Sequence, residues 1–193
     1  KEVFRSAITE FAKHTCINFV EGKGGWGTPY AWVEVAGRRS CSATIGSPGS
    51  WQWAEINLGW CNTMGSRGNV IHLLGHTVGM TPEQRRPDAG RRWKEHGPYL
   101  TIKWQNIPMK WRDLYVPDED AYTGSGNDGR GDPHSNGYAA YDYGSIMSFT
   151  MGGYGSKARM VPKRNMVHMG QRSAFSPGDI KQMLDMYQCK GKR

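Results

Sequence analysis

Apolar residues recur every three or four positions in three stretches of the chain, which is the spacing typical of amphipathic helices. The first stretch covers residues 1–14. The second begins near Asn69, a residue type that caps helices, and ends at Gly79, where the chain can turn. The third begins at Ser176, and Asp179 completes a pattern close to a capping box. We therefore expect one helix near each end of the chain and one between them.

Three shorter stretches between the first two predicted helices indicate β-strands. They cover residues 16–20, 30–36 and 51–58. In the last of these, Trp51 and Trp53 share one face, where they either pack on the sheet or line a binding surface. Beyond the second helix the regular spacing mostly fails, and residues 122–138 have the Gly, Asn, Asp and Ser content of a surface loop. The pattern predicts an α+β protein whose C-terminal part is rich in loops.

The composition limits the classes of function that the chain can have. With 193 residues, of which 37% are hydrophobic and 22% charged, it can bury a core and is typical of globular proteins. No apolar run approaches the ~20 residues of a membrane-spanning helix. The net charge of +8 allows anionic glycans as partners, but the basic residues are too dispersed to favour nucleic acid.

The four cysteines indicate two disulfides, and composition alone leaves three pairings open. No C-x-x-C sequence is present, which argues against a zinc knuckle or a redox pair. Disulfides persist in oxidising compartments. We therefore expect a secreted, extracellular protein.

The second predicted helix carries two histidines at the spacing of a zinc site. His72 and His76 are four residues apart, so their rings lie on one face of the helix, one turn apart. Zinc proteases present two ligands in this way and place a Glu after the first histidine as general base. Here that residue is Leu73, which cannot accept a proton. Gly75, between the two histidines, is expected to weaken the helix.

Several separated stretches, in the same order, make the chain resemble the astacin family of zinc metallopeptidases. The long family pattern H-E-x-x-H-x-x-G-x-x-H-E-x-x-R-x-D is matched between positions 72 and 88 by His72, His76, Gly79, Glu83, Arg86 and Asp88. Other stretches similar to the family are residues 15–20, 40–46, 99–107, 141–147, 170–180 and 184–189. The resemblance therefore extends over most of the chain.

The resemblance implies an α+β, astacin- or metzincin-like fold with two lobes in a single domain. The N-terminal lobe, with a mixed sheet and helices, would cover residues 1–79, and the loop-rich C-terminal lobe residues 80–193. The implied disulfides are Cys16–Cys189 and Cys41–Cys61. Implied structural residues are Gly79 after the zinc helix, Met147 in the methionine turn, and Glu83, which in the family pairs with the mature N-terminus.

The chain departs from the family at three positions of the catalytic chemistry. Leu73 replaces the general base, and Pro82 replaces the third histidine ligand. Phe149 replaces a tyrosine whose hydroxyl in the family lies by the metal and helps to stabilise the transition state. We therefore expect no catalytic residue and no bound zinc, with His72 and His76 as vestigial ligands. The predicted function is that of a pseudopeptidase that acts as a binding or structural component of an extracellular assembly, with an extracellular protein or peptide in its cleft.

Two other functions remain open on the sequence. In the first, the protein is a zinc endopeptidase with residual activity, in which another side chain replaces the third ligand. The residue types that can do so occur at His96, His134, His168 and Glu83. In the second, it is an adhesive module that uses the tripeptide Arg130, Gly131 and Asp132, or binds anionic glycans through basic residues.

Overall fold

The computed structural model describes residues 1–22, 29–46, 53–87, 89, 99–118, 121–122, 140–165 and 168–189. Its α-helices are α1 (Glu2–His14), α2 (Arg67–Thr77) and α4 (Pro177–Met186). Its strands are β1 (Ala31–Glu34), β2 (Ser42–Ala43), β3 (Ala54–Asn57), β4 (Leu100–Ile102) and β5 (Met160–Pro162). Short 3-10 helices are η1 (Gly59–Cys61), η2 (Met64–Ser66), η3 (Glu83–Arg85), η4 (Trp104–Asn106), η5 (Met109–Tyr115) and η7 (Gly155–Lys157). The α+β class expected from the pattern is confirmed.

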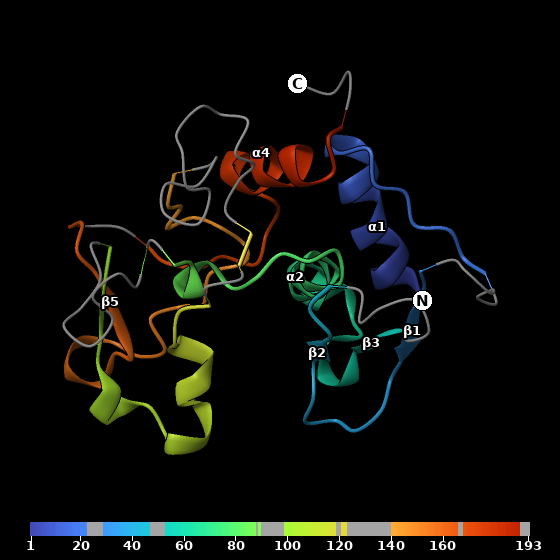
Figure 1. Ribbon diagram of the computed structural model, residues 1–193. Helices are drawn as coiled ribbons and strands as arrows, with labels where there is room; N and C mark the ends of the chain where they lie inside the picture. Colours follow the sequence, from blue (N-terminus) through green and yellow to red (C-terminus); the bar gives the residue numbers. More distant parts are fainter. Residues whose placement is uncertain are drawn as a thin grey trace.

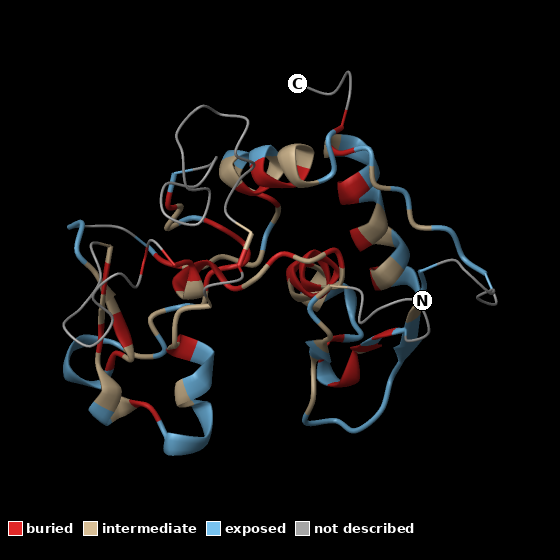
Figure 2. Ribbon diagram, in the orientation of Figure 1, coloured by how far each residue is buried: buried red, intermediate tan, exposed pale blue. Residues whose placement is uncertain are grey.

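The N-terminal part is built around α2, which Figure 1 shows end-on between the sheet and α4, with α1 beside it. Helix α1 directs Val3, Ala7 and Phe11 into the main hydrophobic core. Their spacing of four residues places them on one face, which explains why this short amphipathic stretch is helical. Figure 2 shows that α2 is buried on nearly all sides. Helix α2 is thus the central element of this core.

Two glycines allow the chain to pack closely against α2. A Cβ atom on Gly68 would lie 1.6 Å from the carbonyl oxygen of Arg172, and one on Gly75 would lie 2.6 Å from the Met147 sulfur. Real Cβ atoms do not approach neighbours this closely. Gly75 therefore makes room for the methionine, in addition to any cost that it has for the helix.

The sheet beside α2 has the strand order β1-β3-β2. Strands β1 and β3 are parallel, and β2 runs antiparallel to β3 at the edge. Ala54, Ile56 and Leu58 are buried, as the alternation predicts, whereas Trp53 is 47% exposed. The strand expected over residues 16–20 is wrong: that segment is in no strand and Val20 is 89% exposed. Cys16 is instead bonded to Cys189, and the ring of Phe19 meets that of Phe11 edge-on.

The C-terminal part surrounds a second, smaller hydrophobic cluster. Strands β4 and β5 pair antiparallel, with Leu100 opposite Pro162 and Ile102 opposite Met160. Leu100, Ile102 and Met160 lie in this cluster together with aromatic residues from the loops. The third predicted helix forms as α4, where Ser176 and Asp179 make the expected capping box. This helix returns to the main core through Met183.

Both disulfides implied by the family resemblance are present. Cys16–Cys189 joins the segment after α1 to the end of the described chain, and Cys41–Cys61 closes the loop that contains β2 and β3. The two bonds therefore hold both ends of the described chain and the sheet against the main core.

No helix among the described residues is long and apolar enough to cross a membrane.

Candidate functional site

The two histidines of α2 lie beside the segment of residues 145–149. The Nε2 atoms of His72 and His76 are 3.0 Å apart, and both side chains are buried, with 8% and 7% exposed. Gly75 lies between them and contacts Met147. The structure therefore brings together the histidine pair and the predicted methionine turn, which are about 70 residues apart in the sequence.

Hydrogen bonds determine which nitrogen of each ring carries a proton. The Nδ1 atom of His72 lies 2.8 Å from the carbonyl oxygen of Ile146, and that of His76 lies 2.7 Å from the carbonyl of Met80. A carbonyl only accepts, so both Nδ1 atoms donate. In a neutral ring this leaves a lone pair on each Nε2, and the two lone pairs converge. Histidine ligands of a metal have this same arrangement, in which the outer nitrogen is held by a carbonyl.

The surroundings favour the neutral form of both rings. Burial lowers the pKa of His72 well below its usual range, and the neighbouring His76 and Arg172 lower it further. Burial also lowers the pKa of His76 to about 4, against the effect of its hydrogen bond to Met80. Arg172 itself donates to the carbonyl of Ile146 at 2.8 Å, so one carbonyl serves both the arginine and His72. Near pH 7 both rings are therefore neutral, and each Nε2 has a lone pair that could bind a metal ion.

Within the described residues, the donor set is nevertheless incomplete for a catalytic zinc ion, which uses three protein ligands. Pro82, at the position of the third ligand, is buried and has no side-chain donor atom. Among the residues that the structure describes, no group of three His, Cys, Asp or Glu side chains is placed to hold a metal ion. Two nitrogen donors alone do not fit the family's zinc site.

The four residues predicted as possible substitutes for the third ligand are in different positions. Glu83 is turned toward Arg86 and the backbone of Asp142, as described below. His168 is exposed and belongs to no ligand group within the described chain. His96 and His134 lie outside the described residues. The structure therefore supplies no third ligand from Glu83 or His168.

Leu73 replaces the general base with a core residue. Its side chain is only 3% exposed and belongs to the main hydrophobic cluster. A leucine side chain has no atom that accepts a proton, so it cannot activate water. Its burial also means that the position contributes to packing.

Phe149 is partly buried and packs against the second hydrophobic cluster. Its ring meets Tyr115 edge-on, with the ring centroids 5.8 Å apart. Its backbone N–H donates to Oε1 of the buried Gln84 at 3.1 Å, which ties the methionine turn to η3. The phenylalanine has no hydroxyl, so the position holds the turn without offering a hydrogen bond from its side chain.

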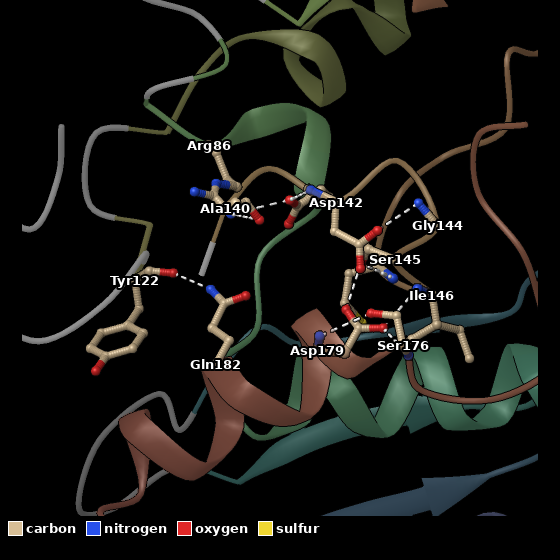
Figure 3. A network of polar contacts seen from close by, with 12 residues as sticks. Arg86, Tyr122, Ala140, Asp142, Gly144, Ser145, Ile146, Ser176, Asp179 and Gln182 are labelled. Carbon is tan, nitrogen blue, oxygen red and sulfur yellow. Dashed lines mark hydrogen bonds and ion pairs between the residues drawn. The ribbon is translucent and has the colours of Figure 1, made fainter. Parts of the chain in front are cut away.

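Glu83 forms a buried ion pair with Arg86 at 3.2 Å. The same oxygen, Oε1, accepts the N–H of Asp142 at 2.8 Å, and Arg86 also donates to the carbonyl of Ala140 (Figure 3). Burial raises the pKa of Glu83 to about 7, against the lowering effect of Arg86. In this structure Glu83 therefore links η3 to the chain before the methionine turn.

The methionine turn is anchored to the start of α4 by Asp179. Its carboxylate accepts the hydroxyl of Ser145 at 2.6 Å and the N–H of Ile146 at 2.9 Å, while also accepting the N–H of Ser176 (Figure 3). Ser145 in turn accepts the N–H of Met147 at 2.9 Å. Burial raises the pKa of Asp179, against these hydrogen bonds. The capping box predicted from sequence thus also positions the residues beside His72.

Arg172 is a site residue that the sequence did not indicate. Besides Ile146, its Nη1 atom donates to the carbonyl of Ser148 at 3.0 Å, so it holds both sides of Met147. No local pattern distinguishes it from the other arginines of the chain.

The adhesion tripeptide Arg130, Gly131 and Asp132 lies outside the described residues and stays a prediction.

Comparisons with known proteins identify the family of the chain. The family model described as Astacin (Peptidase family M12A) matches residues 1–188. The chain is 29% identical to zinc metalloproteinase nas-15 of Caenorhabditis elegans over 98% of its own length, and 26% identical to nas-4 over 99%. It spans only 29% and 54%, respectively, of the lengths of these two relatives.

One similar solved structure is high choriolytic enzyme 1, a hatching-enzyme zinc protease of Oryzias latipes. The TM-score is 0.75, the sequence identity is 22%, and the match covers 98% of this chain and 82% of the other. At this level of identity the likeness concerns the fold. Both elements of the predicted architecture, the helices and the small sheets, are shared with that protein.

Proposed function

The chain belongs to the astacin family of peptidases, and from that premise we propose that it is a pseudopeptidase, an astacin-like domain that does not hydrolyse peptide bonds. The observation that carries this proposal is the buried Leu73 at the position of the general base. General-base assistance contributes ~10²–10⁴-fold to such reactions. Pro82 and Phe149 remove, in addition, the third ligand and the hydroxyl that the family uses.

The remaining site supports a structural role for the same residues. Leu73 belongs to the main core, and Phe149 packs on Tyr115 in the second cluster. Arg172 and Asp179 hold the methionine turn through buried hydrogen bonds. Each of these interactions stabilises the fold without any metal ion.

A binding role is supported by the edge of the sheet. Strand β2 lies at the end of the strand order β1-β3-β2, and the N–H of Gly46, just after it, donates to the carbonyl of His76 at 2.8 Å. The free side of an edge strand can pair with an extended peptide, a mode of binding that needs no metal. In this proposal the protein is secreted and binds an extracellular protein or peptide along β2, as a component of an extracellular assembly.

The test is to measure zinc content and peptidase activity together. The protein is purified without chelators, its zinc is measured by mass spectrometry, and cleavage of a random peptide pool is followed with and without 1,10-phenanthroline. We expect far less than one zinc per chain and no cleavage that the chelator abolishes. Stoichiometric zinc together with chelator-sensitive cleavage would refute the proposal.

One observation favours the second candidate, a zinc endopeptidase with a substitute third ligand. The Nδ1 atoms of His72 and His76 are both held by carbonyls, which leaves two converging Nε2 lone pairs. A His76→Ala variant separates the candidates, because any zinc bound at this pair must be lost with it. If zinc persists in that variant, the metal lies elsewhere and does not support a peptidase.

A further inference from the structure

Three aromatic and two acidic side chains lie together on the exposed face of the sheet, away from α2. They are Tyr30, Trp32, Trp53, Glu34 and Glu55, and they line a depression of about 340 Å³. The two tryptophans are 59% and 47% exposed and the tyrosine 39%. Figure 1 shows the strands β1 and β3 that carry this surface beside the N-terminus. We refer to these five residues as the aromatic–acidic face.

The strand register explains why these side chains meet. Alternate residues of a strand point to the same face. Trp32 and Glu34 of β1 therefore lie on the same side as Tyr30, the residue before β1, and Glu55 of β3 lies on the same side as Trp53, the residue before β3. Trp32 is paired with Glu55 across the parallel strands. The ring of Tyr30 stacks on that of Trp53, with the centroids 5.9 Å apart. The opposite face of the same sheet carries the buried Ala54 and Ile56.

The chemistry of this face suits a cation. Trp32 has Glu55 as its neighbour at about 4.8 Å across the strands and Glu34 at about 6.8 Å along its own strand, by ordinary sheet spacings. An ammonium or guanidinium group over an indole ring is attracted by the π-electrons, and here two carboxylates flank the ring. Within the described chain, neither Glu34 nor Glu55 forms an ion pair with a basic side chain.

The charge of this face differs from that of the chain as a whole. The protein has a net charge of +8, whereas this face carries two carboxylates that pair with no basic side chain of the described residues. A neutral sugar could stack on the rings but has no need of the negative charge. Exposed aromatic patches of this kind are typical of interaction sites.

We propose that the aromatic–acidic face binds lysine or arginine side chains of an extended segment of another protein. In an extended segment, alternate side chains are about 6.8 Å apart, so one basic group can lie over Trp32 and the next over Tyr30 or Trp53. This face is on the side of the sheet opposite the buried Ala54 and Ile56, so the proposal does not depend on whether the protein is a peptidase.

The experiment measures binding of a fluorescein-labelled peptide of four Ser-Lys repeats to the whole chain by fluorescence anisotropy. A peptide of four Ser-Glu repeats is the matched control ligand. We expect saturable binding of the lysine peptide only, weakened as salt is raised from 50 to 500 mM because exposed charges are screened. The absence of binding, or equal binding of both peptides, would overturn the proposal.

Variants of the exposed side chains then locate the site. Trp32→Val should weaken binding about two- to fivefold, the loss expected for one exposed cation–π contact. Glu34→Gln with Glu55→Gln should weaken it by about twofold to tenfold, because two exposed ion pairs are lost. Trp60→Val, which removes another exposed tryptophan, should leave binding unchanged.

Two results would contradict this assignment. Equal binding by the wild type and by the Trp32 and double Glu variants would place the peptide elsewhere. Displacement of the peptide by neutral maltohexaose, with binding insensitive to salt and to the carboxylate-to-amide changes, would identify the face as a sugar site instead. If a variant fails to fold, the salt dependence of lysine-peptide binding to the wild type still tests the proposal.

Discussion

His72 and His76 keep the orientation of metal ligands although the residues around them have changed. The carbonyls of Ile146 and Met80 hold both Nδ1 atoms, so the ring positions are determined by the backbone. Leu73 and Phe149, in contrast, are packed in the two hydrophobic clusters. At the scale of residues, the backbone contacts that orient the two histidines are therefore independent of the side chains that the family uses for catalysis.

Restoring the three altered positions tests this separation. Pro82 has φ −59° and ψ 131°, which a histidine can adopt. We expect the combined variant Leu73→Glu, Pro82→His, Phe149→Tyr to bind about one zinc per chain, because a third ligand completes the set. Zinc is measured by mass spectrometry, with the same triple variant carrying His72→Ala as control. Failure of the triple variant to bind zinc would mean that the pair is not placed for a metal.

A second prediction at this scale concerns Glu83. Its pKa is raised from 4.5 to about 7, so between these values the folded chain holds a proton that the unfolded chain has lost. The stability that this group contributes is therefore fully present below about pH 4.5 and is lost as the pH rises to 7. We expect wild type to lose up to about 3 kcal/mol relative to Glu83→Gln over this range.

Urea denaturation of both proteins between pH 4.5 and 8 measures this difference. The Gln variant is the control, since it has no proton to lose and shares every other titrating group. A difference that is constant with pH, or that grows in favour of wild type as the pH rises, would show that the Arg86 ion pair keeps Glu83 ionised.

At the scale of elements, α2 depends on close contacts from chain segments that are distant in sequence. Gly68 faces the backbone of Arg172, and Gly75 faces the sulfur of Met147. Asp179, at the start of α4, holds the same methionine turn by two hydrogen bonds. The middle helix is thus positioned by the C-terminal segments as much as by the sheet.

Alanine substitutions of three nearby glycines test these contacts. Gly75→Ala should cost about 1–3 kcal/mol of unfolding free energy, because a flexible methionine must move. Gly68→Ala should cost more, because its clash is with backbone atoms. Gly65→Ala, whose nearest neighbour would be 4.0 Å away, is the control and should change little. Equal effects at Gly65 and Gly68 in thermal denaturation would contradict the packing described.

At the scale of the whole molecule, the two disulfides close loops of very different length. Cys16–Cys189 spans 173 residues and Cys41–Cys61 spans 20. The loop-entropy relation gives about 5 kcal/mol for the first and about 3 kcal/mol for the second. The long bond is therefore expected to contribute more to the free energy of unfolding than the short one, because it restricts the unfolded chain more.

Paired Cys→Ala variants check this ranking. Removing Cys16 and Cys189 should lower the unfolding free energy by about 5 kcal/mol, and removing Cys41 and Cys61 by about 3 kcal/mol, in urea titrations. Each variant retains the other bond and serves as its control. The reverse order of the two losses would indicate that native-state contacts, rather than loop closure, dominate.

Local patterns were sufficient for the three helices, for the capping box at Ser176 and for Leu73 beside the first histidine, whereas the altered positions Pro82 and Phe149 were recognised only through the family resemblance. Helix periodicity and caps act within a few residues, and a motif is a list of residue types at known spacing. The family resemblance extended this to the fold and to both disulfide pairings, which composition had left open. The division into lobes at residue 80 and the loss of activity stay predictions.

Other features depended on contacts between distant segments. The segment of residues 16–20 was predicted as a strand, but it pairs with no strand of the described structure. A strand forms only where a neighbouring strand is available for hydrogen bonds, which the local sequence does not reveal. Arg172 and the aromatic–acidic face could not be found by spacing: the arginine acts through carbonyls 24 and 26 residues away, and the face forms only when β1 and β3 lie in register. Periodicity describes one element at a time, whereas a binding surface forms where two elements meet.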